Sequence, residues 1–355
     1  MNKKYIYGII RTDGNGNGAL GINGLGGSAQ VDTITYRGLG CALSDYSGRE
    51  FNSMSKEELI RFLLAHQVVV EHVMKKYTVL PVKFGTLLAT PEEARCLLAQ
   101  GYSQFVDALS WFQDKVEIEV AATWDTEQVL QEISSEEGIV RTRQAIAKSP
   151  GQQTLEERIL LGQMVKASMD RHRDSYRERM ISFLKPAAVD LQPNALLSDQ
   201  MVMSVAFLVE KANQKEFDNR INELNDLFHN QINFRIIGPL PPYSFITVEV
   251  TRLRLEQIEE AKQLLHLGGV ISEPEVRKAY RHLAAETHPD RKPGDEMAKT
   301  RFAKLRQASE LLTACCRGQA ESDGNLLINI KCPRDEEIQQ PSFAEIASLA
   351  GAANG

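Results

Sequence analysis

Two helical patterns separated by the tripeptide His288-Pro289-Asp290 constrain the last third of this 355-residue chain more than any other feature. Proline is excluded from a helix interior because its ring removes a backbone donor and clashes with the preceding turn, so the first helix must end before Pro289. Turn-forming residues occupy 292–295, and helical spacing resumes behind them. We therefore predict two antiparallel helices joined by a loop that carries His288, Pro289 and Asp290.

The helix before this loop has a clear start signal and two different faces. Ser272 is a hydroxyl N-cap, and Glu275 stands three residues later, where it can complete a capping box. Apolar residues then recur at i, i+4 and i+7, as Val276, Tyr280 and Leu283. The cations that point elsewhere are Arg277, Lys278 and Arg281. The pattern predicts one face that packs and one that is basic.

The same region is basic although the whole chain is acidic. Residues 276–317 hold ten Lys or Arg against five Asp or Glu, whereas the chain carries a formal net charge of −6. Such a surface favours electrostatic steering toward an acidic partner. His282 and His288 stand six residues apart with no cysteine pair in ligand spacing nearby, so we expect no metal site here.

This stretch resembles a J-domain over about residues 255–317, with Leu255–Leu267 as its shorter first helix. The resemblance implies that the loop tripeptide contacts a DnaK-type ATPase and stimulates its ATP hydrolysis, while the three cations supply the docking face. It also implies a core that includes Phe302, Leu305 and Leu312. Ala284, Ala285 and Glu286 replace residues that are often basic in the family. A module that keeps the fold without the ATPase coupling therefore stays open as an alternative.

Composition is that of an ordinary globular chain with room for two or three domains. No apolar run approaches the roughly 18 to 20 residues that span a bilayer, and the N-terminus enters an alternating strand pattern without the apolar core of a signal peptide. The five cysteines form no CxxC pair, which is typical of a reducing compartment. We expect a cytoplasmic protein with no metal, no cofactor, no membrane partner and no nucleic-acid partner.

The first 124 residues alternate between strand and helix patterns. Strands are predicted at 3–11, 31–36, 39–44, 78–85 and 115–124, and helices from Ser55 onward and at 91–112. The glycine-rich segment Gly14–Gly27 has no Gly-Lys-Ser/Thr ending, so we interpret it as a flexible loop rather than a phosphate cradle. His66 lies on the apolar face of its helix, where we predict a hydrogen-bonded core histidine rather than a ligand.

The next 127 residues repeat this mixture with longer helices. Helices are predicted at 126–147, 154–184 and 214–230, with strand patterns at 201–210 and 234–250. The mixed-sign run from Arg171 to Arg179 lacks interleaved aromatic residues, so we interpret it as a solvated helix face. After the J-domain-like stretch, residues 319–355 are expected to be a partly ordered tail with one short strand at 325–330.

These patterns predict an α+β fold class: two ferredoxin-like α/β sandwich domains followed by a small all-α J-domain helical hairpin. The predicted domain ranges are 1–124, 125–251, 252–318 and 319–355.

A second resemblance covers about residues 3–250. Four strings carry it: Tyr5-Ile-Tyr-Gly-Ile, Leu64-Ala-His-Gln with Val70-Glu71, Val79-Leu-Pro-Val-Lys-Phe-Gly-Thr86, and Gly238-Pro-Leu-Pro-Pro-Tyr-Ser-Phe245. Together, in this order, they are similar to the gas vesicle protein family of the F and L type. We interpret the strings as core and turn residues of that fold, and no shell-binding residue is assigned among them.

The two resemblances imply a gas vesicle assembly factor, associated with gas vesicles, that binds the apolar shell protein and other accessory proteins and recruits a DnaK-type ATPase. The alternative is a general DnaJ-type co-chaperone with broad client binding. An enzyme is the third class, but the sequence holds no nucleophile constellation, metal-ligand cluster or phosphate loop, so we expect no catalytic residues.

Overall fold

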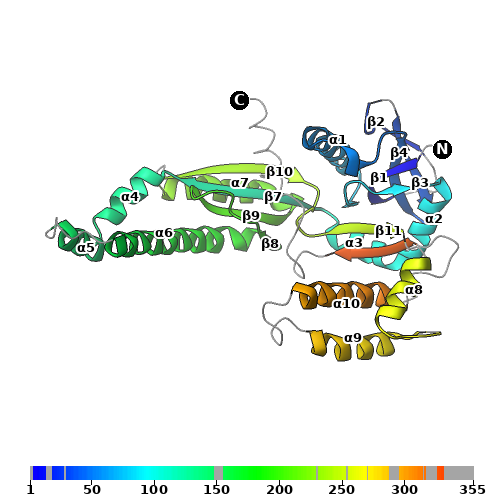
Figure 1. The fold of residues 1–355 in the computed structure, drawn as a ribbon. Coiled ribbons are helices and arrows are strands. Elements are labelled where there is room, and N and C mark those ends of the chain that lie inside the picture. Colours follow the sequence, from blue (N-terminus) through cyan, green and yellow to red (C-terminus); the bar gives the residue numbers. More distant parts are fainter. Residues whose placement is uncertain are drawn as a thin grey trace. The chain divides into compact units, whose positions relative to one another are not determined.

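The computed structural model describes residues 3–12, 18–27, 29–147, 155–228, 231–252, 255–269, 271–287, 296–314, 316 and 326–331. Contacts divide these residues into two compact units. The first contains the described residues of 3–111 and 247–331, and the second those of 112–246. Both units mix helices with strands, and the first also carries a helical module near its C-terminal end (Figure 1). The α+β fold class predicted from the sequence is confirmed.

The first unit is built on a six-stranded antiparallel sheet of order β2-β3-β4-β1-β5, with β6 also paired to β1. Its strands are β1 (Lys3–Arg11), β2 (Gly18–Asn23), β3 (Gln30–Tyr36), β4 (Leu39–Tyr46), β5 (Val79–Pro81) and β6 (Leu87–Leu88). The strands predicted at 31–36 and 39–44 are confirmed as β3 and β4, which form an antiparallel hairpin. Its two-residue turn places Arg37 and Gly38 at φ 48° and 82°, the left-handed geometry that matches strand twist.

The prediction of a flexible loop at Gly14–Gly27 is partly wrong. Residues 13–17 lie outside the described residues, but Gly18–Asn23 forms β2, which pairs antiparallel with β3. Glycine hides a strand pattern because it supplies no side chain to alternate. The neighbouring strand nevertheless satisfies its backbone donors and acceptors.

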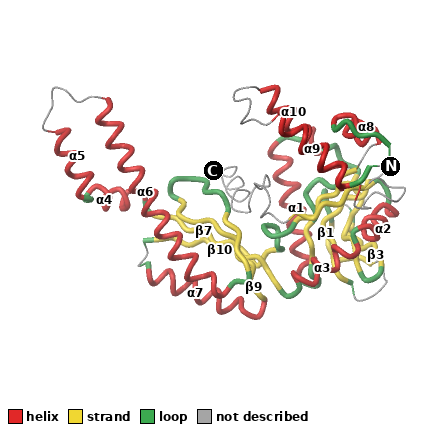
Figure 2. Tube along the Cα trace, turned by 90° about the horizontal axis from the view of Figure 1, so that it is seen from below, coloured by secondary structure: helices red, strands yellow, loops and turns green. Residues whose placement is uncertain are grey.

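Helices flank this sheet, as Figure 2 shows in red against the yellow strands. Helix α1 (Lys56–Met74) begins with the predicted capping box, in which Ser55 and Glu58 bond each other's backbone N–H groups. The single helix predicted at 91–112 is two helices, α2 (Pro91–Gln100) and α3 (Tyr102–Phe112). They divide at Gly101, where a Cβ atom would lie 2.4 Å from the Phe105 ring.

The second unit has a four-stranded antiparallel sheet of order β10-β7-β9-β8. Its elements are β7 (Lys115–Trp124), α4 (Thr126–Ser134), α5 (Glu137–Ala147), α6 (Leu155–Leu184), β8 (Asp190–Pro193), β9 (Met201–Glu210), α7 (Gln214–Leu227) and β10 (Ile232–Leu240). Numbered within the unit, the strand order is 4-1-3-2 with helical connections after the first and third strands. That is the ferredoxin-like split βαβ arrangement.

Strand β7 changes the predicted domain boundary. We predicted that residues 115–124 close the first domain, but β7 pairs with β9 and β10 of the second sheet. The division between the units therefore lies at 111/112 rather than 124/125. Alternation identifies a strand but leaves open which sheet it joins.

The helical module consists of α8 (Leu255–Leu264), α9 (Glu273–Thr287) and α10 (Glu296–Ala314). Helix α8 ends three residues before the predicted Leu267, and His266 adopts a left-handed backbone at φ 56°. A two-stranded antiparallel sheet frames the module in sequence, with β11 (Thr247–Arg252) before it and β12 (Leu326–Lys331) after it. Strand β12 confirms the short strand predicted at 325–330, whereas the rest of the predicted tail lies outside the described residues.

Candidate functional site

The helical module has a buried core of its own. All three helices contribute to it: Ala261, Leu265, Val276, Leu283, Leu305, Ala308 and Leu312. The predicted core positions Leu305 and Leu312 are almost fully buried. The partly buried Phe302 lies with its ring centroid 6.5 Å from that of Tyr280. The apolar stripe predicted for α9 therefore faces the other helices, which leaves the opposite side of α9 for other contacts.

The first turn of α9 is fixed by the predicted partners. The Ser272 backbone N–H and hydroxyl both donate to Glu275 Oε2, at 2.9 and 2.7 Å. These bonds from Ser272 hold the pKa of the Glu275 carboxyl below its usual value. Because the cap fixes where the helix begins, it also fixes which side chains lie on its exposed face.

The three predicted docking cations are exposed on α9. Arg277 pairs with Glu273 one turn earlier, and Arg281 Nε donates to the Arg277 carbonyl at 3.3 Å. Lys278 forms no ion pair with any residue that the structure describes. The structure brings these cations to one exposed helical surface, which we call the α9 basic face. The other predicted site residues, His288, Pro289 and Asp290, lie outside the described residues.

Three of the four strings that carry the second resemblance meet in one core of the first unit. The Tyr5 hydroxyl lies 2.9 Å from His66 Nδ1 and accepts the Gly85 N–H at 3.1 Å. Tyr7 bonds Ser44 at 2.9 Å and accepts the Leu25 N–H at 2.8 Å. Rings pack around this pair, from Tyr46, Phe51 and Phe84.

His66 has the role that the sequence predicts. Its side chain is buried and bonded to Tyr5, and burial lowers the pKa of the imidazole to about 3. A neutral ring held this way by a tyrosine is a core element rather than a proton donor or a ligand. The first three strings therefore describe packing, as we interpreted them.

The fourth string lies in the second unit and is anchored by a residue that the sequence argument missed. Glu117 of β7 is buried and accepts the Ser244 N–H at 2.8 Å and the Ser244 hydroxyl at 2.7 Å. Burial raises the pKa of this carboxyl to about 8, against the lowering effect of the two bonds. The local alternation Val116-Glu117-Ile118-Glu119 is typical of a strand with one polar face, so it held no signal that Glu117 is buried.

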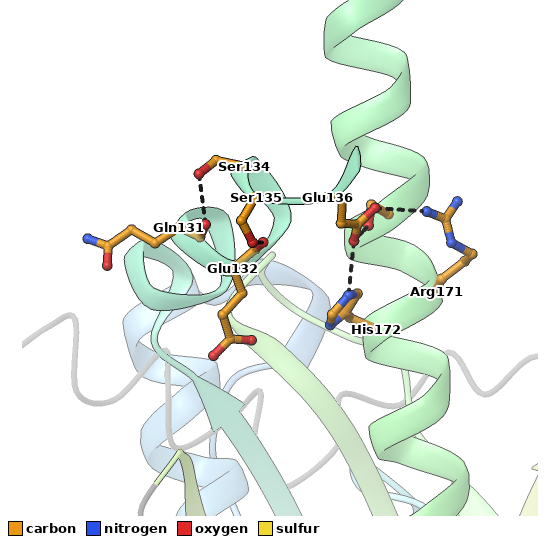
Figure 3. A network of polar contacts seen from close by, with 8 residues as sticks. Gln131, Glu132, Ser134, Ser135, Glu136, Arg171 and His172 are labelled. Atoms are coloured by element: carbon orange, nitrogen blue, oxygen red, sulfur yellow. Dashed lines mark hydrogen bonds and ion pairs between the residues drawn. The ribbon is translucent and has the colours of Figure 1, made fainter. Parts of the chain in front are cut away.

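A second missed cluster ties the helices α4, α5 and α6 together (Figure 3). The hydroxyls of Ser134 and Ser135 donate to carbonyls of the preceding turn and so close the end of α4. The next residue, Glu136, accepts a bond from the buried Ser168 of α6. It also lies 3.4 Å from Arg171 Nη2 and 3.2 Å from His172 Nε2. The bond from Ser168 is the main cause of the lowered pKa of Glu136.

The region 171–179 is therefore more than a solvated face. Arg171 and His172 bond Glu136, and the Arg173 guanidinium stands over the Trp124 ring at 5.4 Å. Arg177 pairs with Asp174 within the helix at 2.8 Å. Most of these charges have partners inside the unit.

A shallow groove of about 420 Å³ lies between α6 and α7. Its walls are mostly apolar and comprise Arg179, Ser182, Phe183, Leu224, Leu227 and Phe228. Leu227 is 54% exposed. The Arg179 guanidinium stands 5.1 Å from the centre of the Phe228 ring and has no carboxylate partner among the described residues. The groove thus combines an exposed apolar floor with one cation that is free to bind an anion.

Within the described residues, no helix is long and apolar enough to cross a membrane. The same residues hold no group of three or more His, Cys, Asp or Glu side chains that could bind a metal ion.

Comparison with known proteins supports both sequence resemblances. The family model for gas vesicle synthesis protein GvpL/GvpF matches residues 3–247, and the DnaJ domain model matches residues 257–315. Gas vesicle protein F of Streptomyces sp. is 26% identical over 242 residues, which cover 68% of this chain and 98% of that protein. Gas vesicle protein F2 of Halobacterium salinarum is 23% identical over 256 residues, covering 71% of this chain and 96% of the relative.

Solved structures show the same fold. The crystal structure of gas vesicle protein GvpF from Anabaena sp. PCC7120 matches with a TM-score of 0.59 at 21% identity, covering 69% of this chain and 98% of that one. GvpF from Microcystis aeruginosa matches with a TM-score of 0.56 at 22% identity and similar coverage.

Proposed function

Because this chain belongs to the GvpL/GvpF family of gas vesicle proteins and also carries a DnaJ domain, we propose that it is a gas vesicle assembly factor that holds the apolar shell protein and recruits a DnaK-type ATPase. One observation carries the proposal. A region as long as a whole gas vesicle protein F is joined in one chain to a three-helix module with its own core. The protein acts in the cytoplasm, in association with gas vesicles and their other accessory proteins.

The gas vesicle region and the DnaJ-like module would together prevent aggregation of the shell subunit before it polymerises. A shell subunit that exposes a large apolar surface before it polymerises is prone to aggregate. A protein that covers this surface keeps the subunit available, and an ATP-driven chaperone brought to the same complex supplies the work of release. In this scheme the α9 basic face docks on an acidic surface of the chaperone, and His288, Pro289 and Asp290 stimulate its ATP hydrolysis.

The groove between α6 and α7 is the shell-protein site that the contacts favour. The apolar face of a shell-protein helix would bury the exposed Leu227 side chain against Phe183 and Phe228. A carboxylate beside that helix would bind Arg179. The groove therefore suits an amphipathic acidic segment better than a purely apolar one.

Co-purification of the shell protein with the full chain, without ATP, tests this site. Leu227→Glu places a charge on the apolar floor, and we expect it to weaken binding by about tenfold or more, the equivalent of losing one buried leucine contact. Ile236→Glu is the matched control, because Ile236 is 46% exposed on β10 and lies outside the groove. Equal binding by both variants would remove the groove from the account.

The general co-chaperone alternative predicts a different outcome of the same experiment. A broad client binder would retain unrelated unfolded proteins as strongly as the shell protein. Preference for the shell protein over reduced, unfolded client proteins of similar size favours the dedicated factor.

A further inference from the structure

Strand β12 belongs to neither matched region, yet it is part of the first unit. The family matches end at residues 247 and 315, whereas β12 spans Leu326–Lys331. It pairs antiparallel with β11 over six residue pairs, from Thr247↔Lys331 to Arg252↔Leu326. The helical module is therefore enclosed between two paired strands rather than attached at one end.

Strand β11 is in turn joined to the segment that follows β5. Val82 forms a parallel bridge with Val248, and the Lys83 N–H donates to the Val248 carbonyl at 2.9 Å. One edge of β11 thus contacts β12, and its other edge contacts the segment 82–83. The joint is part of the backbone hydrogen bonding of the first unit.

Charge and packing reinforce this joint. Glu249 lies between two lysines, with Oε1 at 2.7 Å from Lys83 Nζ and Oε2 at 3.3 Å from Lys331 Nζ. On the other face of the ribbon, Leu326 and Ile328 of β12 are buried, as is Val248 of β11. A surface tail would leave these apolar side chains in water, so β12 has the composition of a structural strand.

We propose that β12 is a strap that holds the DnaJ-like module on the first unit at both of its ends and so restricts the orientations in which a recruited chaperone is held on that unit. A module joined at one end by a few residues samples many orientations, whereas two fixed ends restrict it. The structural half of this proposal stands on the strand pairing alone. The positioning half rests on the proposed function.

Hydrogen exchange of the full chain tests the strap itself. Ile328→Ser removes a buried apolar contact from β12, while Asn329→Ser introduces the same residue at the exposed neighbouring position. We expect the amides of residues 247–252 to exchange at least tenfold faster in Ile328→Ser than in wild type or Asn329→Ser. A chain that stops at residue 318 gives a second test, with the same acceleration expected. Exchange at the wild-type rate in this shorter chain would overturn the proposal.

The ATPase rate of the DnaK-type chaperone tests whether the strap lies outside the module's own fold. Ile328→Ser and wild type should stimulate ATP hydrolysis within about twofold of each other, because the module has a core of its own. Loss of stimulation in Ile328→Ser would overturn the strap, because β12 would then be part of the folded module itself. If neither wild type nor any variant stimulated ATP hydrolysis, the proposed chaperone role would be wrong. Hydrogen exchange alone would then test whether β12 is a strap.

Discussion

Two buried polar residues of this protein, His66 and Glu117, form bonds whose partners lie far away in sequence. His66 was predicted as a core histidine because it lies on an apolar helical face, and it is one. Its partner, Tyr5, is 61 residues away, and no local pattern could identify it. Glu117 and Ser244 are 127 residues apart. Residue type and periodicity predict burial, but the choice of partner depends on tertiary packing.

Glu117 gives the second unit an unusual dependence on pH. Its pKa is raised from 4.5 to about 8 in the folded protein, so between these values the folded state retains a proton that the unfolded state has lost. Its contribution to stability is complete below pH 4.5 and is lost as pH rises toward 8. The free energy of opening should therefore fall as pH rises, by at most about 1.4 kcal/mol per pH unit.

Hydrogen exchange of β7 amides, corrected for the intrinsic pH effect, measures this slope. Glu117→Gln should flatten it between pH 5 and 8 while retaining most of the stability at neutral pH. Glu223→Gln, an exposed glutamate on α7, controls for the loss of a carboxylate. A wild-type slope in Glu117→Gln would assign the effect to another group.

At the scale of elements, helices with capping signals could be predicted well. The Ser55 and Ser272 caps begin α1 and α9 where their hydroxyl and glutamate spacing indicates. The prediction was weaker where glycine is involved. Glycines concealed β2, and Gly101 divides a helical pattern that periodicity treats as continuous. Local sequence signals predict where a helix begins, whereas the formation of a strand such as β2 depends on pairing with another strand.

Glu136 is predicted to hold the α4–α5 connection against α6. Glu136→Ala would leave the buried Ser168 hydroxyl without its acceptor, which typically costs about 1–3 kcal/mol. We expect faster hydrogen exchange in α5 and in the facing part of α6.

The neighbouring residue provides the control. Glu137 is exposed and pairs only with Arg141 on its own helix among the described residues, so Glu137→Ala should change exchange little. If Glu137→Ala loosened the helices as much as Glu136→Ala, the cluster in Figure 3 would have no special role.

At the scale of the whole molecule, the sequence predicted the order of the parts better than their boundaries. The gas vesicle and DnaJ regions were recognised at nearly the ranges that the family models match. Strand β7 was assigned to the wrong sheet, and β12 was predicted as a strand without its role in the first unit. The strand at β12 was predicted correctly, but its partner and the partners of β7 were not, and both gaps have one cause. A strand's own sequence specifies its alternation, while its partner is chosen by the complete fold.

In the function that we propose, one chain couples gas vesicle assembly to an ATP-driven chaperone. The decisive measurement is ATP hydrolysis by the DnaK-type chaperone of the same organism in the presence of the full chain and the shell protein. We predict that wild type raises the rate, that His288→Gln abolishes the increase, and that His282→Gln on α9 preserves it. An equal rate with wild type, with His288→Gln and with no added chain would contradict the claim, because the module would then keep its fold without coupling to an ATPase.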